Sequence, residues 1–189
     1  MKLNRTSVLL VVSILLSGCY GPVKDDNLVT KSYEAADSLL IISGKNKSNH
    51  QVVLDDDKPI VVASFVNIDN MLESSRLGRI IAEQVASRMS QQGYYVVELK
   101  LRKNIFIKEQ TGELLLSREV KDVSKTHGAQ AVVIGTYAAG KEYVYISLRI
   151  VTPENNKIIA SYDYRLPIGA DTQELLELKS ENKGSRSWR

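Results

Sequence analysis

The clearest hydrophobic pattern in the chain lies at residues 76–91. Every fourth residue from Leu77 to Met89 is apolar, which is the spacing of one helical face. Gly78 begins a parallel row of small residues that would let this helix approach a sheet closely. A serine at position 74 or 75 can cap its N-terminus, and Gly93 marks its end. The pattern predicts a helix at 76–91.

Two apolar segments flank this helix. Residues 60–66 are apolar on both alternations, which is typical of a strand covered on both faces, and Pro59 fits its first position. Residues 94–101 form a second predicted strand. A strand, a helix and a strand in this order make a βαβ unit, whose crossover is right-handed and whose strands are parallel.

The middle of the chain has weaker signals. A short strand is predicted at 105–107 and a turn at 110–112. Ser117 can cap a helix at 118–126, and 131–137 is a third strand of the buried type. Outside this region, apolar spacing predicts a helix at 28–43, capped by Gly44. A final helix is also expected at 170–179.

The pattern changes to strict alternation at 143–151 and 157–166. One predicted face of the first strand carries Val144, Ile146, Leu148 and Ile150. One predicted face of the second carries Ile158, Ala160, Tyr162, Tyr164 and Leu166. Alternation is typical of antiparallel strands with one covered and one wetter face. The predicted fold is therefore mixed α/β: a βαβ half, then an antiparallel three-strand meander, with helices packed on the sheet.

The N-terminus carries a lipoprotein signal. Two basic residues precede an apolar run at 8–16, which is too short to cross a bilayer but fits a secretory leader. The run ends in Leu16-Ser17-Gly18-Cys19, which contains the one cysteine of 189 residues. We expect cleavage between Gly18 and Cys19 and lipid attachment to Cys19. Tyr20 stands where an aspartate would signal inner-membrane retention, so we expect the outer membrane, on its periplasmic face.

These segments give a predicted organisation. It comprises a signal peptide at 1–18, a tether at 19–27, an N-terminal helix with a polar linker at 28–58, an α/β domain at 59–167, and a C-terminal helix with a basic tail at 168–189. Loss of Lys2 and Arg5 reduces 25 Lys and Arg to 23, against 22 Asp and Glu, a formal net charge of +1. Nucleic-acid binding needs a clustered basic surface, so this class of partner is not expected.

Signatures of catalysis are sparse. The two histidines lack a second histidine at ligand spacing, and Cys19 is committed to lipid, so the usual zinc sites and a cysteine nucleophile are not expected. Neither a nucleophile elbow nor a phosphate-binding glycine fingerprint follows any predicted strand. We therefore expect no enzyme activity, no metal and no cofactor.

Two places remain as candidate binding sites. Asn67, Asp69 and Asn70 follow the first predicted strand, where open α/β sheets tend to bind ligands, although a simple connecting loop would have the same composition. The polar face of the meander carries Tyr145, Arg149, Asp163 and Arg165, a mixture that suits protein contacts. A surface pairing of Arg149 with Asp163 would give the same pattern.

Several short motifs occur in one order along residues 28–167. They are Ser75-Arg76-Leu77-Gly78-Arg79, Glu83-Gln84, Gln92-Gly93-Tyr94, the segment 113–119, Gly135-Thr136-Tyr137 and Arg149-Ile150-Val151. In this order, behind a lipoprotein signal, the chain resembles the FlgO family of flagellar outer-membrane lipoproteins. The domain also looks like a distant relative of the TolB N-terminal and CsgG periplasmic domains. The basic tail from Lys183 to Arg189 has no counterpart in the family pattern.

The resemblance implies a non-catalytic outer-membrane lipoprotein needed for motility. It also implies work at the flagellar base with FlgP-type and FlgT-type ring proteins, and suggests a homo-oligomeric ring. An alternative hypothesis is a lipid-anchored periplasmic binding module of another envelope or secretion pathway. An enzyme acting on peptidoglycan or a nucleotide is a third and weaker alternative.

Overall fold

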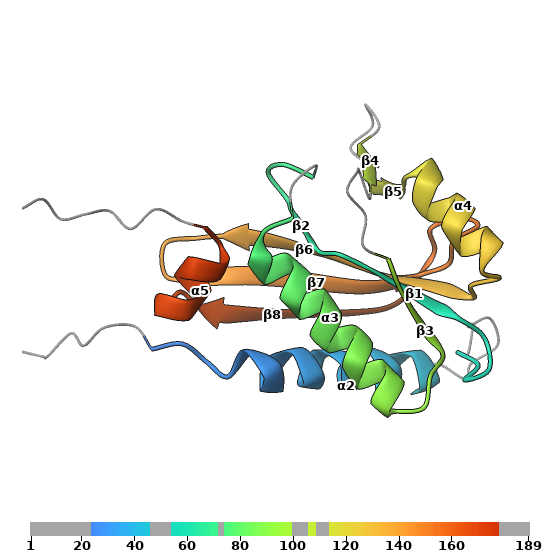
Figure 1. Ribbon diagram of the computed structural model, residues 1–189, viewed down its shortest axis with the longest axis horizontal. Coiled ribbons are helices and arrows are strands. Elements are labelled where there is room, and N and C mark those ends of the chain that lie inside the picture. The colour runs from blue at the N-terminus through green and yellow to red at the C-terminus, as the bar shows by residue number, and fades with distance from the viewer. Residues whose placement is uncertain (1–23, 46–53, 72–73, 100–105, 109–113, 178–189) are drawn as a thin grey trace, which may run out of the picture.

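A computed structural model of the chain describes residues 24–45, 54–71, 74–99, 106–108 and 114–177. Figure 1 shows a twisted sheet accompanied by helices. The helices are α2 (Leu28–Lys45), α3 (Arg76–Gln91), α4 (Arg118–Thr126) and α5 (Ala170–Leu175). The strands are β1 (Ile60–Ala63), β2 (Val66–Asn67), β3 (Val96–Leu99), β4 (Phe106–Lys108), β5 (Leu114–Leu116), β6 (Ala131–Ala139), β7 (Tyr143–Val151) and β8 (Ile158–Pro167).

Six of these strands form one mixed sheet in the order β3-β1-β6-β7-β8, with β2 paired to β6. β1 lies parallel to both β3 and β6, so the predicted βαβ unit is confirmed. β6, β7 and β8 are antiparallel neighbours, which confirms the three-strand meander. The fold class is therefore mixed α/β with helices packed on the sheet, as the hydrophobic pattern predicts.

Local signals place α3 and α4 correctly at both ends. The Oγ of Ser75 accepts a hydrogen bond from the N–H of Gly78 (3.2 Å), and the Oγ of Ser117 accepts one from the N–H of Val120 (3.3 Å). Each bond satisfies an amide that the first helical turn leaves unpaired. α2 extends past its predicted cap, because the helix continues through Gly44 to Lys45.

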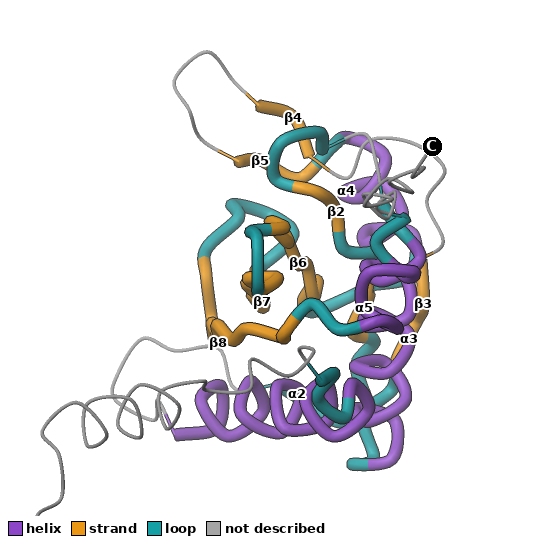
Figure 2. The backbone as a smooth tube through the Cα atoms, turned by 90° about the vertical axis from the view of Figure 1, so that its left-hand side faces the viewer, coloured by secondary structure: helices purple, strands orange, loops and turns teal. Residues whose placement is uncertain are grey.

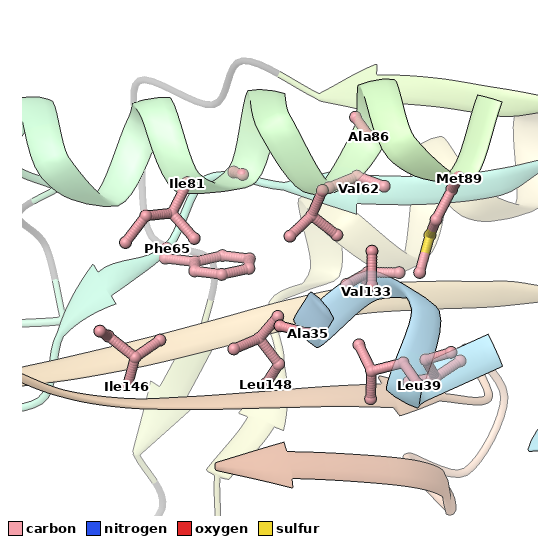
Figure 3. Packing of buried hydrophobic residues seen from close by; sticks show 14 of the residues in the cluster. Ala35, Leu39, Val62, Phe65, Ile81, Ala86, Met89, Val133, Ile146 and Leu148 are labelled. Carbon is pink, nitrogen blue, oxygen red and sulfur yellow. The ribbon is translucent and has the colours of Figure 1, made fainter. Parts of the chain in front are cut away.

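The main core lies between the sheet and the pair α2 and α3. Figure 3 shows Leu39 of α2 and Ile81 of α3 among side chains of β6 and β7. Ala35, Ala36 and Leu39 are fully buried. α2 was predicted to precede the domain at 59–167, but its apolar face belongs to the same core. Helix periodicity reveals such a face without revealing what covers it.

The first strand is interrupted, which corrects the prediction of one strand at 60–66. The chain turns at Phe65, whose side chain is fully buried. Its ring lies over Gly135 of β6, where a Cβ would come within 2.5 Å of the ring. The Oγ of Ser74 donates to the carbonyl oxygen of Phe65 (2.6 Å). The close approach of α3 predicted from Gly78 is confirmed, because a Cβ there would lie 2.4 Å from the same oxygen.

The predicted faces of β8 need one correction. Ile158 was assigned to the covered face, yet it is 50% exposed, whereas Ile159 is 5% exposed. The register shifts between Ile150 and Val151, so that Ala160 lies opposite Ile150 but Ile158 lies opposite Val151. A bulge of this kind adds a residue to one strand and re-aims its neighbours.

Two shorter predictions also change. β4 was predicted one residue earlier, and its antiparallel partner β5 was not predicted. α5 ends at Leu175, before the predicted end at 179. The predicted signal peptide, Cys19, the turn at 110–112 and the tail at 183–189 lie outside the described residues.

Candidate interaction surface

The second face of the sheet is covered only in part. Val120 of α4 packs against Val61 of β1 and Val132 of β6. Figure 2 shows α2 and α4 on opposite sides of the sheet. Over β7 and β8 this second face is polar, and the Tyr145 side chain is 54% exposed. We call this part the open meander face; it comprises Tyr143, Tyr145, Ser147, Arg149, Ser161, Asp163 and Arg165.

Strand register brings the four predicted surface residues onto this face. Tyr145 of β7 lies opposite Arg165 of β8, and Arg149 lies opposite Ser161. Asp163 lies opposite Ser147. Directly opposed side chains on one face of an antiparallel pair lie within reach of each other. The predicted residues therefore form one continuous surface across two strands.

Two interactions order the open meander face. The Arg165 guanidinium carbon lies 4.3 Å from the centre of the Tyr143 ring, a cation–π geometry. The Ser147 hydroxyl donates to Oδ1 of Asp163 (2.5 Å). Within the described part of the chain, Arg149 and Asp163 form no ion pair with each other. In this structure Asp163 is paired with Ser147 instead.

Tyr143 and Ser147 were not included in the predicted partner surface. Their alternation with Val144 and Ile146 placed them on the polar face, so the sequence pattern was sufficient to add them to the predicted surface. Their roles depend on the residues opposite them, which single-strand patterns do not give. Tyr143 and Ser147 position Arg165 and Asp163 and complete the surface.

The candidate ligand loop lies elsewhere, at the β2 side of β6. Asn67 belongs to β2, and its side-chain oxygen accepts a hydrogen bond from the N–H of Asp69 (2.9 Å). The N–H of Ile68 donates to the carbonyl oxygen of Tyr137 (2.9 Å). Asp69 and Asn70 are exposed. Ligand binding by the loop stays a prediction.

Among the residues that the structure describes, no cluster of three or more His, Cys, Asp or Glu side chains could hold a metal ion. Nor does any helix there have the length and apolar character needed to cross a bilayer.

Comparison with protein families gives a match to the model of the FlgO protein family over residues 33–171. The chain belongs to the FlgO family. That family comprises flagella-associated lipoproteins, in agreement with the resemblance carried by the motifs. The match begins inside α2, the helix that shares the main core.

Comparison with solved structures gives distant matches. The LpoB C-terminal domain from Salmonella enterica matches with a TM-score of 0.46 and 12% identity, covering 71% of this chain and 96% of that one. E. coli LpoB matches with a TM-score of 0.47 and 11% identity, covering 79% and 73%. A PelC dodecamer from Paraburkholderia phytofirmans matches at 0.42 and 13%, covering 65% and 79%. These similarities are too distant to assign a function, and the predicted relation to TolB and CsgG stays a prediction.

Comparison with curated proteins finds no match.

Proposed function

We propose that this FlgO-family protein is a non-catalytic outer-membrane lipoprotein of the flagellar basal body. In this role it supports ring assembly or flagellar stability, and thereby motility. The observation that carries the proposal is the family match over 33–171, and the predicted lipoprotein signal supports it.

The lipid anchor is the first part of the proposed function. Cleavage between Gly18 and Cys19 leaves Cys19 as the first residue, and its acyl chains hold the protein at the periplasmic face of the outer membrane. Each buried CH₂ contributes about 0.8 kcal/mol, and two or more chains hold stably. Residues 20–23 then separate the anchor from the described part of the chain, which begins at Lys24.

Contact with ring proteins is the second part. The open meander face presents Tyr145, Arg149, Asp163 and Arg165 to partners, which we expect to be FlgP-type and FlgT-type proteins and further copies of this chain. Exposed tyrosine and arginine are residue types enriched at protein interfaces. In a closed ring the contacts of one subunit become effectively intramolecular, so individually weak contacts add up.

The mechanism needs no turnover, no cofactor and no nucleic acid. The covered face of the sheet supplies a rigid support, because its strands pack against two helices at once. The opposite face of the same strands is then presented in a fixed geometry. A rigid surface loses little conformational entropy on binding.

Complementation of a deletion strain tests the proposal. Wild-type protein should restore swimming, whereas Cys19→Ser should yield a soluble periplasmic protein and fail to restore it. Membrane fractionation and swim-plate diameter are the two readouts. Normal swimming and intact flagella in the deletion strain would instead favour a binding module of another envelope pathway. Membrane association of Cys19→Ser equal to wild type would contradict the anchor.

A further inference from the structure

The segment that precedes α2 already contacts the domain, through Asp25. Oδ2 of Asp25 accepts a hydrogen bond from the N–H of Asp171 (2.9 Å), and Oδ1 accepts one from the N–H of Thr172 (3.1 Å). These amides open α5, so Asp25 satisfies donors that the helix start leaves free. Burial alone would raise the pKa of Asp25, but a hydrogen bond with the Thr172 side chain, together with the backbone hydrogen bonds, holds it below its usual value.

The packing around Asp25 is close. A Cβ on Gly169 would lie 2.4 Å from the carboxyl carbon of Asp25, so only glycine leaves room for this contact. Asn27 caps α2 next, since its side-chain oxygen accepts from the N–H of Thr30 (3.1 Å). The chain therefore joins the folded body at Asp25, two residues ahead of the predicted tether end at 27.

Asp25 lies at one end of the sheet. The N–H of Ile168, just after β8, donates to the carbonyl oxygen of Glu142 in the β6–β7 turn (2.7 Å). α5, the β6–β7 turn and the start of α2 consequently gather at the same end, on the left in Figure 1. The β7–β8 turn, which contains Glu154, lies at the opposite end.

The distance from anchor to domain is short compared with the domain itself. Asp25 follows Cys19 by six residues, which span at most about 20 Å when fully extended. β7 alone has nine residues and is about 30 Å long. A lipid on Cys19 therefore holds the Asp25 end of the sheet close to the bilayer.

Resting on the proposed lipidation of Cys19, we propose that the end bearing α5 and the β6–β7 turn faces the lipid headgroups. The orientation comes from chain length and the Asp25 contact, because this end exposes charges of both signs: Lys24 and Lys141 against Asp26 and Asp171. β7 and β8 then run away from the membrane. The open meander face points sideways, toward neighbours anchored in the same bilayer.

Two labelled variants test the orientation. Lys141→Cys marks the β6–β7 turn and Glu154→Cys marks the β7–β8 turn, and both positions are exposed. Acylation blocks Cys19, so a fluorophore reacts only with the new thiol. The lipidated protein is placed in vesicles of neutral phospholipid that contain a headgroup-linked quencher. We expect quenching several-fold stronger for the label at 141, and little change with salt. Equal quenching, or stronger quenching at 154, would overturn the orientation.

A longer tether provides the second variant. Insertion of about 20 Gly and Ser residues after Tyr20 adds roughly 25 Å of flexible chain and leaves every described contact intact. We expect the difference in quenching between the labels at 141 and 154 to become much smaller. A difference that persists would show that chain length does not orient the domain, and would overturn the inference.

Mass spectrometry of the N-terminal peptide separates the two possible failures. An unmodified Cys19 overturns the proposed anchor, and the orientation with it. An acylated Cys19 combined with equal quenching overturns the orientation alone. Circular dichroism of each labelled protein verifies that the fold is retained.

Discussion

The two faces of the meander differ sharply although they share the same strands. In β7, Val144, Leu148 and Ile150 are fully buried beneath the helices. The residues between them are polar or aromatic and partly exposed, with Tyr145 54% exposed. Neighbouring residues of one strand therefore differ in role: the buried ones stabilise the fold, and the exposed ones form the proposed partner surface. A substitution on one face should leave the other face unaffected.

The largest expected effect separates two adjacent residues of β7. Leu148→Ala removes a fully buried side chain and should lower the free energy of unfolding by about 2–5 kcal/mol. Arg149→Ala, one position along, should stay within about 0.5 kcal/mol of wild type, because this side chain is partly exposed and forms no ion pair with another described residue. Urea denaturation of the detergent-solubilised lipoprotein measures both. Equal losses would contradict the division of the strand into two roles.

A smaller loss is expected from overpacking the covered face. Gly135→Ala places a Cβ within 2.5 Å of the Phe65 ring, so the ring or the strand must shift. Overpacking of this kind typically costs about 1–3 kcal/mol. Gly140→Ala in the β6–β7 turn is a matched control, because its Cβ would meet the Tyr143 carbonyl oxygen at 3.1 Å instead of a core ring. Urea denaturation measures both variants. An unfolding midpoint for Gly135→Ala no lower than that for Gly140→Ala would contradict this packing.

The next prediction concerns the contact between α2 and α3, the two helices that cover the buried face of the sheet. Arg88 of α3 donates to both carboxyl oxygens of Asp37 of α2, each at 2.8 Å, and its guanidinium carbon lies 5.5 Å from the Tyr33 ring centre. Hydrogen bonds from Arg88 hold the pKa of Asp37 below its usual value of 3.8, although burial opposes this shift and a bond from Gln92 supports it. Because the pKa is lower in the folded state, this stabilisation is present above the unfolded pKa.

Asp37→Asn should therefore be less stable than wild type at neutral pH, by about 1 kcal/mol for a partly exposed pair. The difference should close as the pH falls through the folded pKa of Asp37, where wild type also loses the charge. Thermal unfolding across acidic pH measures the two curves. A constant difference between them at all pH values would show that the charge on Asp37 does not stabilise α2 against α3.

Much of this fold follows from local sequence signals. α3 and α4 each begin at a capping serine, and apolar residues recur along each helix at helical spacing. Both signals are local, because they involve only residues of the helix and its immediate neighbours. The alternation of β7 likewise depends only on which residues are apolar. The place of α2 in the core, the turn at Phe65 and the bulge at Ile159 could not be predicted in this way. Each depends on a contact with a distant part of the chain, such as the space that Gly135 leaves for Phe65.

For the candidate surface, too, the local pattern was predictable and the long-range contacts were not. Alternation assigned Tyr145 and Arg149 to one face of their strand, and Asp163 and Arg165 to one face of theirs. The pairing between the strands was not predictable, because register determines that Asp163 meets Ser147 and not Arg149. Asp25 was missed for a similar reason. A carboxylate in a polar tether gives no sign that it caps a helix near the other end of the chain.

Retention in flagellar basal bodies tests the role of the open meander face most directly. The double variant Arg149→Glu with Arg165→Glu reverses two charges on this face, and Arg118→Glu with Lys125→Glu reverses two exposed charges on α4 as a matched control. We expect the first variant to remain folded in the outer membrane, with at most the small loss of stability that follows from removing the Arg165–Tyr143 contact, yet to be lost from purified basal bodies, while the control is retained. Equal retention of both variants would contradict the assignment of the open meander face as the partner surface.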